Sequence, residues 1–171
     1  ATLPCAALTA WSALVTYDDL RPGSRVLVQG TGGVALFAIR FAKLIGAEVT
    51  VISSSDDKLA RARQLGADAG INYRTTPEWS RPARELTGGA GFDHIVELGG
   101  EKTLPQSLRC IRAGGTLSMI GVLSGSSLAA PLGLVVTRQV RLQGITVGHR
   151  DGFEAMLRAV EQHRIRPVVD R

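Results

Sequence analysis

The 171-residue sequence is poor in several features that define whole classes of protein. Its only cysteines are Cys5 and Cys110, without CxxC spacing, which excludes a disulfide framework and predicts a reducing, cytoplasmic location. No apolar run reaches the roughly 20 residues of a membrane span, and no secretory signal is visible. The net charge is +5, but basic residues are scattered and only 5% of residues are aromatic. We therefore expect neither a membrane nor a nucleic acid as a partner.

What the sequence does contain is an apolar strand that runs into a glycine-rich turn and then a helix. The stretch reads Val26-Leu27-Val28-Gln29-Gly30-Thr31-Gly32-Gly33-Val34-Ala35. Gly30 permits a tight turn, Gly32 lets the backbone approach a phosphate, and Ala35 lets the helix pack close to the strand. The helix N-terminus offers free N–H groups and partial positive charge. This context predicts a dinucleotide pyrophosphate site, with a plain strand–helix turn as the alternative.

Strands and helices alternate along the rest of the chain. We expect strands at Arg25–Gln29, Glu48–Ser53, Ile71–Tyr73, Phe92–Leu98, Thr116–Ile120 and Val140–Val147. We expect helices at Gly33–Ile45, Asp56–Leu65, Pro77–Leu86, Thr103–Ile111 and Gly152–His163. Apolar strands without hairpin signals predict an α/β fold, a doubly wound six-stranded parallel Rossmann sheet with helices on both faces. Leu123–Pro131 is the one long loop, either a lid over a ligand or a plain surface loop.

The end of the second strand bears on the choice of dinucleotide. NAD-binding sheets place Asp or Glu there, about 20 residues after the glycines, to bind the ribose. Here the residue is Ser53, followed by Ser54, Ser55 and, one helical turn later, Lys58. Hydroxyls and an ammonium suit the adenosine 2′-phosphate, so the sequence favours NADP over NAD. Two alternatives stay open: Ser54 or Ser55 caps the next helix, or a shifted register places Asp56 on the ribose and favours NAD.

Together these motifs resemble the cofactor domain of the medium-chain dehydrogenase/reductase superfamily, which includes zinc alcohol dehydrogenases and zinc-free quinone oxidoreductases. The segments that carry the likeness are Ala1–Trp11, Pro22–Val28, Leu65–Asp68, Ile71–Arg74, Asp93–Glu97 and Gly114–Leu117. The resemblance implies one NAD(P)-binding Rossmann domain over residues 1–171. Residues 1–22 would lead in from a substrate domain as a helix, and residues 164–171 would return to it. We therefore expect a domain cut from a two-domain reductase, able to bind cofactor but not to turn over substrate.

The resemblance also assigns cofactor contacts by position, with no catalytic residue among them. The glycine-rich turn from Gly30 would hold the pyrophosphate through Thr31, Gly32, Gly33 and Val34. The 2′-phosphate would meet the serine run Ser53, Ser54 and Ser55 together with Lys58, and Tyr73 would lie along the adenosine. The ribose and nicotinamide path would be lined by Leu98 and Gly99. The nicotinamide itself would be flanked by Val122, Leu123, Val147, Gly148 and, beneath the ring, Thr9.

The implied function is hydride transfer between NADP(H) and a small alcohol, aldehyde, ketone, quinone or enone, bound through the other domain. The alternatives are a cofactor-binding sensor or structural protein without catalysis, and an S-adenosylmethionine-dependent methyltransferase. Cys5 stands where zinc-dependent relatives place a metal ligand, but no His or Cys pairs with it at ligand spacing, so zinc stays open. His94 is expected to face solvent or a helix. The strand at Val140–Val147 is implied to pair with its two-fold mate in a homodimer.

Overall fold

The sheet is the centre of the molecule, a computed structural model that describes residues 3–128 and 130–168. All pairings are parallel, in the order β3-β2-β1-β4-β5-β6. The strands are β1 (Arg25–Gln29), β2 (Glu48–Ser53), β3 (Ala69–Asn72), β4 (Phe92–Glu97), β5 (Ile111–Met119) and β6 (Arg141–Gly144). This confirms the predicted doubly wound Rossmann sheet. The described residues contain no antiparallel strand, whereas the methyltransferase alternative usually has one as its seventh strand.

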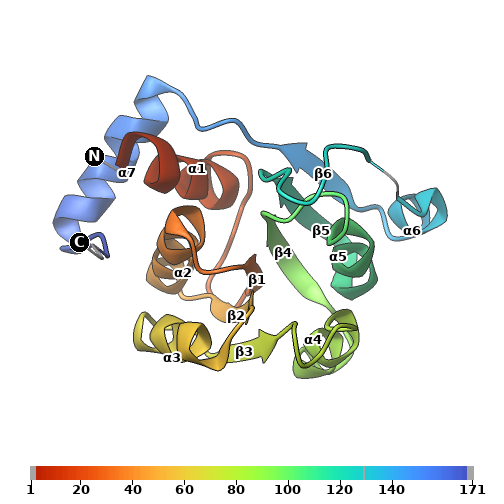
Figure 1. Cartoon of the computed structure of the whole chain (residues 1–171). Helices are drawn as coiled ribbons and strands as arrows, with labels where there is room; N and C mark the ends of the chain where they lie inside the picture. Colours follow the sequence, from red (N-terminus) through yellow and green to blue (C-terminus); the bar gives the residue numbers. More distant parts are fainter. Residues whose placement is uncertain (1–2, 129, 169–171) are drawn as a thin grey trace.

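Helices cover both faces of the sheet (Figure 1). One layer holds η1 (Leu3–Ala7), α1 (Leu8–Trp11), η2 (Ser12–Thr16), α2 (Gly33–Ile45) and α3 (Asp56–Gln64), with α7 (Arg150–Gln162) packed on α1. The other layer holds α4 (Ser80–Leu86), α5 (Leu104–Cys110) and α6 (Leu132–Thr137). The N-terminal helical segment thus ends at Thr16, and residues 17–24 lead from it into β1.

Each face of the sheet has its own apolar core because successive side chains of a strand point to opposite sides. Val26 and Val28 of β1 lie in the core beneath α1 and α2, whereas Leu27 lies in the core beneath α4 and α5. In the first core Phe41 packs edge-on against Trp11, with ring centroids 5.3 Å apart. Because both faces of the sheet are buried in apolar cores, the strands are held in place, and so are the loops that begin where the strands end.

Several elements of the first half of the chain have the predicted boundaries, whereas β3 runs from Ala69 to Asn72 rather than from Ile71 to Tyr73. β1, α2 and β2 begin and end at the expected residues, and α2 stops at Gly46, which takes the left-handed φ of 89° expected of a C-terminal glycine. α4 begins three residues later than predicted, at Ser80 rather than Pro77. β5 begins at Ile111 rather than Thr116, because its register against β4 shifts by a bulge and lets the pairing extend backwards.

Two further differences between the predicted and the observed elements lie after β5. The chain forms α6, which periodicity did not predict, directly after the expected loop. β6 ends at Gly144 instead of continuing to Val147, so the prediction of a strand over Val140–Val147 was too long. After Gly144 the chain leaves the sheet, and Val147 adopts a φ of 54°, a left-handed conformation that a β-branched residue rarely takes.

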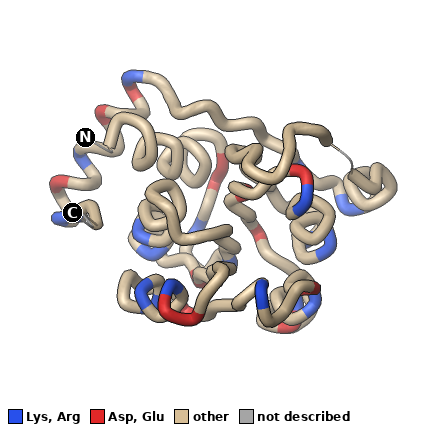
Figure 2. Tube along the Cα trace, viewed as in Figure 1, with Lys and Arg blue, Asp and Glu red and all other residues tan. Residues whose placement is uncertain are grey.

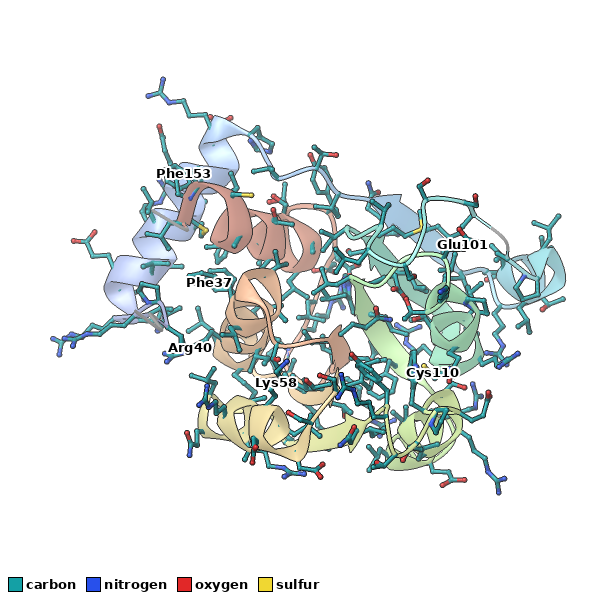
Figure 3. All side chains as sticks on the ribbon, in the orientation of Figure 1. Phe37, Arg40, Lys58, Glu101, Cys110 and Phe153 are labelled. Atoms are coloured by element: carbon teal, nitrogen blue, oxygen red, sulfur yellow. The ribbon has the colours of Figure 1, made fainter. Side chains whose placement is uncertain are left out.

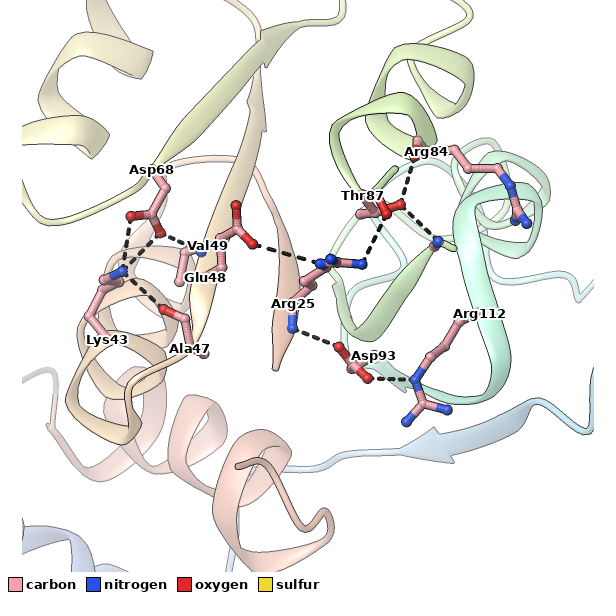
Figure 4. A network of polar contacts seen from close by, with 11 residues as sticks. Arg25, Lys43, Ala47, Glu48, Val49, Asp68, Arg84, Thr87, Asp93 and Arg112 are labelled. Atoms are coloured by element: carbon pink, nitrogen blue, oxygen red, sulfur yellow. Dashed lines mark hydrogen bonds and ion pairs between the residues drawn. The ribbon is translucent and has the colours of Figure 1, made fainter. Parts of the chain in front are cut away.

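Polar contacts tie together the amino ends of the strands (Figure 4). Asp68 accepts hydrogen bonds from Val49 N–H at 2.7 Å and from Lys43 Nζ at 2.9 Å. Burial alone would raise the pKa of Asp68, but the Val49 N–H and the Lys43 ammonium outweigh it and lower that pKa. Asp93 similarly accepts from Arg25 N–H at 2.7 Å. These contacts fix the amino ends of the strands, at the end of the sheet opposite the glycine-rich turn.

Asp18 anchors the segment between η2 and β1 to three strands. Its carboxylate contacts His94 Nδ1, Thr116 Oγ1 at 3.2 Å and an Arg141 guanidinium nitrogen at 3.7 Å. Burial alone would raise the pKa of Asp18, but the hydrogen bond and charge of His94 lower it overall. His94 is completely buried, so of the two expected surroundings, solvent or a helix, solvent is excluded. Its role is to join the N-terminal segment to the sheet.

Charged residues of both signs are interspersed along the trace (Figure 2). Exposed pairs such as Arg81–Glu85 at 3.2 Å and Arg150–Glu154 at 2.7 Å span one helical turn and add little stability. Among the residues that the structure describes, no helix combines the length and apolarity needed to cross a membrane.

Candidate cofactor-binding site

The candidate site lies at the carboxyl edge of the sheet, where the strand order reverses between β1 and β4. Connections run in opposite directions on the two sides of this point, which leaves a crevice between the loops that follow the two strands. A cavity of about 460 Å³ occupies this edge. Five of the predicted cofactor residues line it, namely Gly30, Tyr73, Leu98, Gly99 and Leu123.

The glycine-rich turn has the backbone geometry that a pyrophosphate requires. Gly30 has a φ of 76° and donates its N–H to Ile52 O at 2.7 Å, so the turn is held against β2. Gly32 is the N-cap of α2, and a Cβ placed on it would meet no protein atom within 4 Å. The helical hydrogen bonds begin with Leu36 N–H to Gly32 O, so the N–H groups of residues 33–35 have no partner among the described residues. The turn fits a dinucleotide phosphate.

Gly33 serves packing as well as ligand access. Its missing side chain lets Ala6 of η1 approach, since a Cβ on Gly33 would lie 3.3 Å from Ala6 Cβ. The N-terminal helices therefore sit directly beside the first turn of α2, next to the half-buried Val34. Gly33 is thus constrained by packing against η1, whereas the space beside Gly32 is open to solvent.

The residues predicted for the 2′-phosphate meet at the end of β2. The Ser53 hydroxyl is buried and lies 3.4 Å from Thr31 Oγ1, which connects it to the glycine-rich turn. Lys58 Nζ is 3.5 Å from Ser54 Oγ and the side chain is exposed on the α3 side of the molecule (Figure 3). Tyr73 N–H donates to Ser53 O at 3.0 Å, so the tyrosine follows alongside. Hydroxyls and one cation therefore converge at this strand end.

The two alternatives for this segment have separate outcomes. Ser55 is the N-cap of α3 and accepts Lys58 N–H at 3.4 Å, as the capping interpretation expected. The register shift does not occur, since β2 ends at Ser53 opposite Asn72. Asp56 instead accepts a hydrogen bond from Asn72 Nδ2 at 3.2 Å, so its carboxylate is engaged with β3. Ser53, and no acid, holds the strand-end position.

A hydrogen-bond network beneath the turn after β4 was not predicted. Glu97 Oε1 accepts the N–H groups of Gly99 at 3.0 Å and Gly100 at 3.1 Å. Gln29 Oε1 accepts those of Leu98 at 3.1 Å and Gly99 at 3.0 Å. Both side chains are buried. The available signal in the sequence was an acid directly after the apolar pair Ile95-Val96, at the end of the strand.

The residues expected around the nicotinamide come from three separate segments. Thr9 is buried and donates its hydroxyl to Cys5 O at 2.7 Å. Gly148 packs against the same helical segment, because a Cβ there would lie 2.4 Å from Ser12 Oγ. The strained φ of Val147 brings the chain into this contact. Val122 and Leu123 stand on the loop after β5 and are 65% and 89% exposed.

The described residues do not supply a metal site. They contain no group of three or more His, Cys, Asp and Glu side chains that could hold an ion. Cys5 is exposed, and burial raises the pKa of the Cys110 thiol to about 12, which makes it a poor metal ligand. His149 is engaged as the N-cap of α7, with its Nδ1 accepting Gly152 N–H at 3.2 Å. The described residues alone therefore do not complete a zinc site.

The sheet order, the reversal point and the glycine-rich edge define a Rossmann-type domain. The family model for zinc-binding dehydrogenases matches residues 33–162, and the chain belongs to this family. That confirms the resemblance to the medium-chain dehydrogenase/reductase superfamily.

Individual relatives agree with the family. A zinc-type alcohol dehydrogenase-like protein of Schizosaccharomyces pombe is 47% identical, over 100% of this chain and 51% of its own length. A solved structure assigned as an alcohol dehydrogenase from Sinorhizobium meliloti 1021 is 50% identical, with a TM-score of 0.94 over 99% of this chain and 50% of its own. A structure titled NAD-dependent alcohol dehydrogenase is 38% identical, with a TM-score of 0.88, over 96% and 48%. The chain thus spans about half the length of these relatives.

Proposed function

We propose that the chain is the NADP(H)-binding domain of an oxidoreductase that transfers hydride to or from a small alcohol, aldehyde, ketone, quinone or enone. The observation that carries the proposal is the turn at Gly30–Gly33, which presents unpartnered N–H groups and open space at the reversal point of the sheet. The names of the relatives, alcohol dehydrogenases and a zinc-type alcohol dehydrogenase-like protein, support the reaction class. The bound nicotinamide would supply or accept the hydride.

The protein's own residues would bind and orient this cofactor from one end to the other. Backbone from Gly30 to Val34 would bind the pyrophosphate. At the adenosine end, Ser53, Ser54 and Lys58 would bind the 2′-phosphate beside Tyr73, while Ser55 caps α3. The segments around Thr9, Leu98–Gly99, Val122–Leu123 and Val147–Gly148 would enclose the nicotinamide half. A substrate domain would complete the site, and any zinc would be bound chiefly by residues outside this chain.

The preference for NADP rests on the end of β2 rather than on the relatives, one of which is titled NAD-dependent. No carboxylate occupies the strand-end position itself, and the nearby Asp56 carboxylate is engaged by Asn72, so no acid stands where an NAD-binding sheet binds both ribose hydroxyls. Lys58 Nζ lies beside Ser54 Oγ and is free to move toward an incoming phosphate. Because few cysteines are present and neither is paired, we also propose a cytoplasmic location.

Replacing Lys58 with Ala tests the cofactor assignment by calorimetric titration with NADPH and NADH in parallel. We expect the affinity for NADPH to fall about tenfold, as for loss of one charge-assisted hydrogen bond, and that for NADH to stay unchanged. The matched control is Arg61→Ala, an exposed cation on the same helix without a hydrogen bond to any described residue. A wild-type domain that binds NADH more tightly than NADPH would contradict the assignment.

We also propose that the protein forms a homodimer through the strand predicted at Val140–Val147. β6 is an edge strand with a side unpaired by any described residue, and β6 and α6 lie at one end of the molecule (Figure 1). Exposed apolar side chains gather in the loop and helix before it: Val122, Leu123, Leu128, Leu132 and Val136. Light scattering at high micromolar concentration is expected to give twice the chain mass of 18.1 kDa. A mass of 18.1 kDa would contradict the dimer.

A further inference from the structure

Glu97 is a buried carboxylate that the binding proposal leaves without a role. It is 1% exposed, and no cation forms an ion pair with it among the described residues. Besides the two backbone N–H groups of the turn, it accepts from the Thr103 hydroxyl, from Ser107 Oγ at 2.5 Å and from Gln29 Nε2 at 2.6 Å. In all five contacts the partner is a hydrogen-bond donor and a Glu97 oxygen is the acceptor. Burying a carboxylate is costly, and these five donors offset that cost while they fix the turn after β4.

The same turn holds the loop that follows β5. Gly99 O accepts both the N–H and the hydroxyl of Ser124, each at 2.8 Å, and Ser124 Oγ accepts Lys102 N–H at 2.9 Å. Glu101 forms a second attachment, donating its N–H to Gly125 O at 3.2 Å. Figure 3 places Glu101 at the α5 side of the molecule. The loop is thereby attached to the turn after β4 by hydrogen bonds.

Apolar packing contributes little to holding this loop. Val122 and Leu123 are 65% and 89% exposed, so their side chains do not bury the loop against the sheet. The position of both residues therefore depends on the hydrogen bonds that join the loop to the turn after β4, from Ser124 to Gly99 and from Glu101 to Gly125. We propose that Glu97 is a positioning residue, which fixes the Leu98–Gly100 turn and, through Gly99 and Ser124, places Val122 and Leu123 against the nicotinamide half of the cofactor.

The sheet order determines which half of the cofactor is affected. The ends of β2 and β3 lie on one side of Gly30, and the ends of β4 and β5 lie on the other. The residues proposed for the 2′-phosphate stand on the first side, and the Glu97 network stands on the second. The inference rests on the proposed function, and it predicts that damage to the network weakens binding of the whole dinucleotide but not of its adenosine end.

The test is to replace Glu97 with Gln and titrate with two ligands, NADPH and adenosine 2′,5′-bisphosphate. The amide turns one acceptor into a donor, so at least one surrounding donor loses its partner. We expect the affinity for NADPH to fall about tenfold, as for loss of a hydrogen bond to a charged group, and that for the bisphosphate to stay within about twofold. Equal losses for both ligands, or no loss for either, would overturn the proposal.

A second variant keeps the test decisive if Glu97→Gln does not fold. Ser124→Ala removes the hydroxyl contacts to Gly99 and Lys102 outside the core, and the same selective loss is expected, with recovery in Ser124→Thr. Ser126→Ala is the control, since this exposed serine of the same loop makes no side-chain hydrogen bond to any described residue. If wild-type protein bound neither ligand, the proposed function would fail and this inference with it.

Discussion

Gly32→Asp is expected to abolish detectable NADPH binding while leaving the fold at least as stable as the wild type. The new side chain would stand in open space at the N-cap of α2, where its carboxylate can accept the free N–H groups of the first turn. The same groups are the proposed pyrophosphate donors, and the added negative charge repels the phosphates. We expect the affinity to fall by at least about 100-fold and the stability to rise by a few tenths of a kcal/mol.

Two measurements separate these effects, a thermal melt and a calorimetric titration. Gly32→Asn is the matched control, because it caps the helix with a neutral group of similar shape and so isolates the contribution of charge. It is expected to bind NADPH more weakly than wild type but more tightly than Gly32→Asp. Wild-type affinity in the Asp variant would show that the dinucleotide does not cross this turn.

Gly121→Ala is expected to cause the largest loss of stability from a single methyl group. Gly121 follows β5 where the chain passes very close to the end of β4. A Cβ there would lie 1.8 Å from Leu98 O and 2.5 Å from Leu98 C, both backbone atoms that cannot rotate away. The strand ends must separate, and the hydrogen bond from Gly121 N–H to Glu97 O at 3.2 Å is disturbed. We expect the free energy of unfolding to fall by about 4 kcal/mol.

Gly133→Ala provides the opposite case within the same chain. Gly133 lies in α6, and a Cβ there meets no atom within 4 Å. The methyl group should therefore stabilise the protein by about 0.5–1 kcal/mol through the higher helix propensity of alanine. Urea denaturation of both variants measures the difference. Equal midpoints would show that the approach between the ends of β4 and β5 is looser than the structure indicates.

Local patterns in the sequence were sufficient to predict most of the fold. The boundaries of β1, α2 and β2 follow from a β-branched or apolar run, an amphipathic period and the glycines at each end, all of which act within a few residues. α6 was missed because Leu132–Thr137 is short and has no polar face to reveal a helical period. β6 was predicted too long because its apolar residues continue past Gly144, where the chain turns toward the N-terminal helices.

The proposed 2′-phosphate residues could be predicted because they are close in sequence and follow one strand. The Glu97 network could not, since its members come from distant parts of the chain. Gln29 and Ser107, which hydrogen-bond at 2.9 Å, are 78 positions apart. Nothing in either neighbourhood indicates the other, and they meet only because β1 pairs with β4 and α5, which carries Ser107, packs on these strands. The partner of His94 was missed for the same reason, since Asp18 lies 76 positions away.

The polar contacts of Asp68 and Asp93 have a consequence for how the sequence of this domain can change without loss of the fold. They secure the strand beginnings and the helix C-terminus at one edge, using side chains that take no part in the proposed site. Substitutions of exposed loop residues at the opposite end of the strands, away from the close approach of Gly121 to Leu98, therefore leave this scaffold intact. A lineage built on such a sheet can exchange one ligand for another by changing loop residues, with little risk of losing the fold.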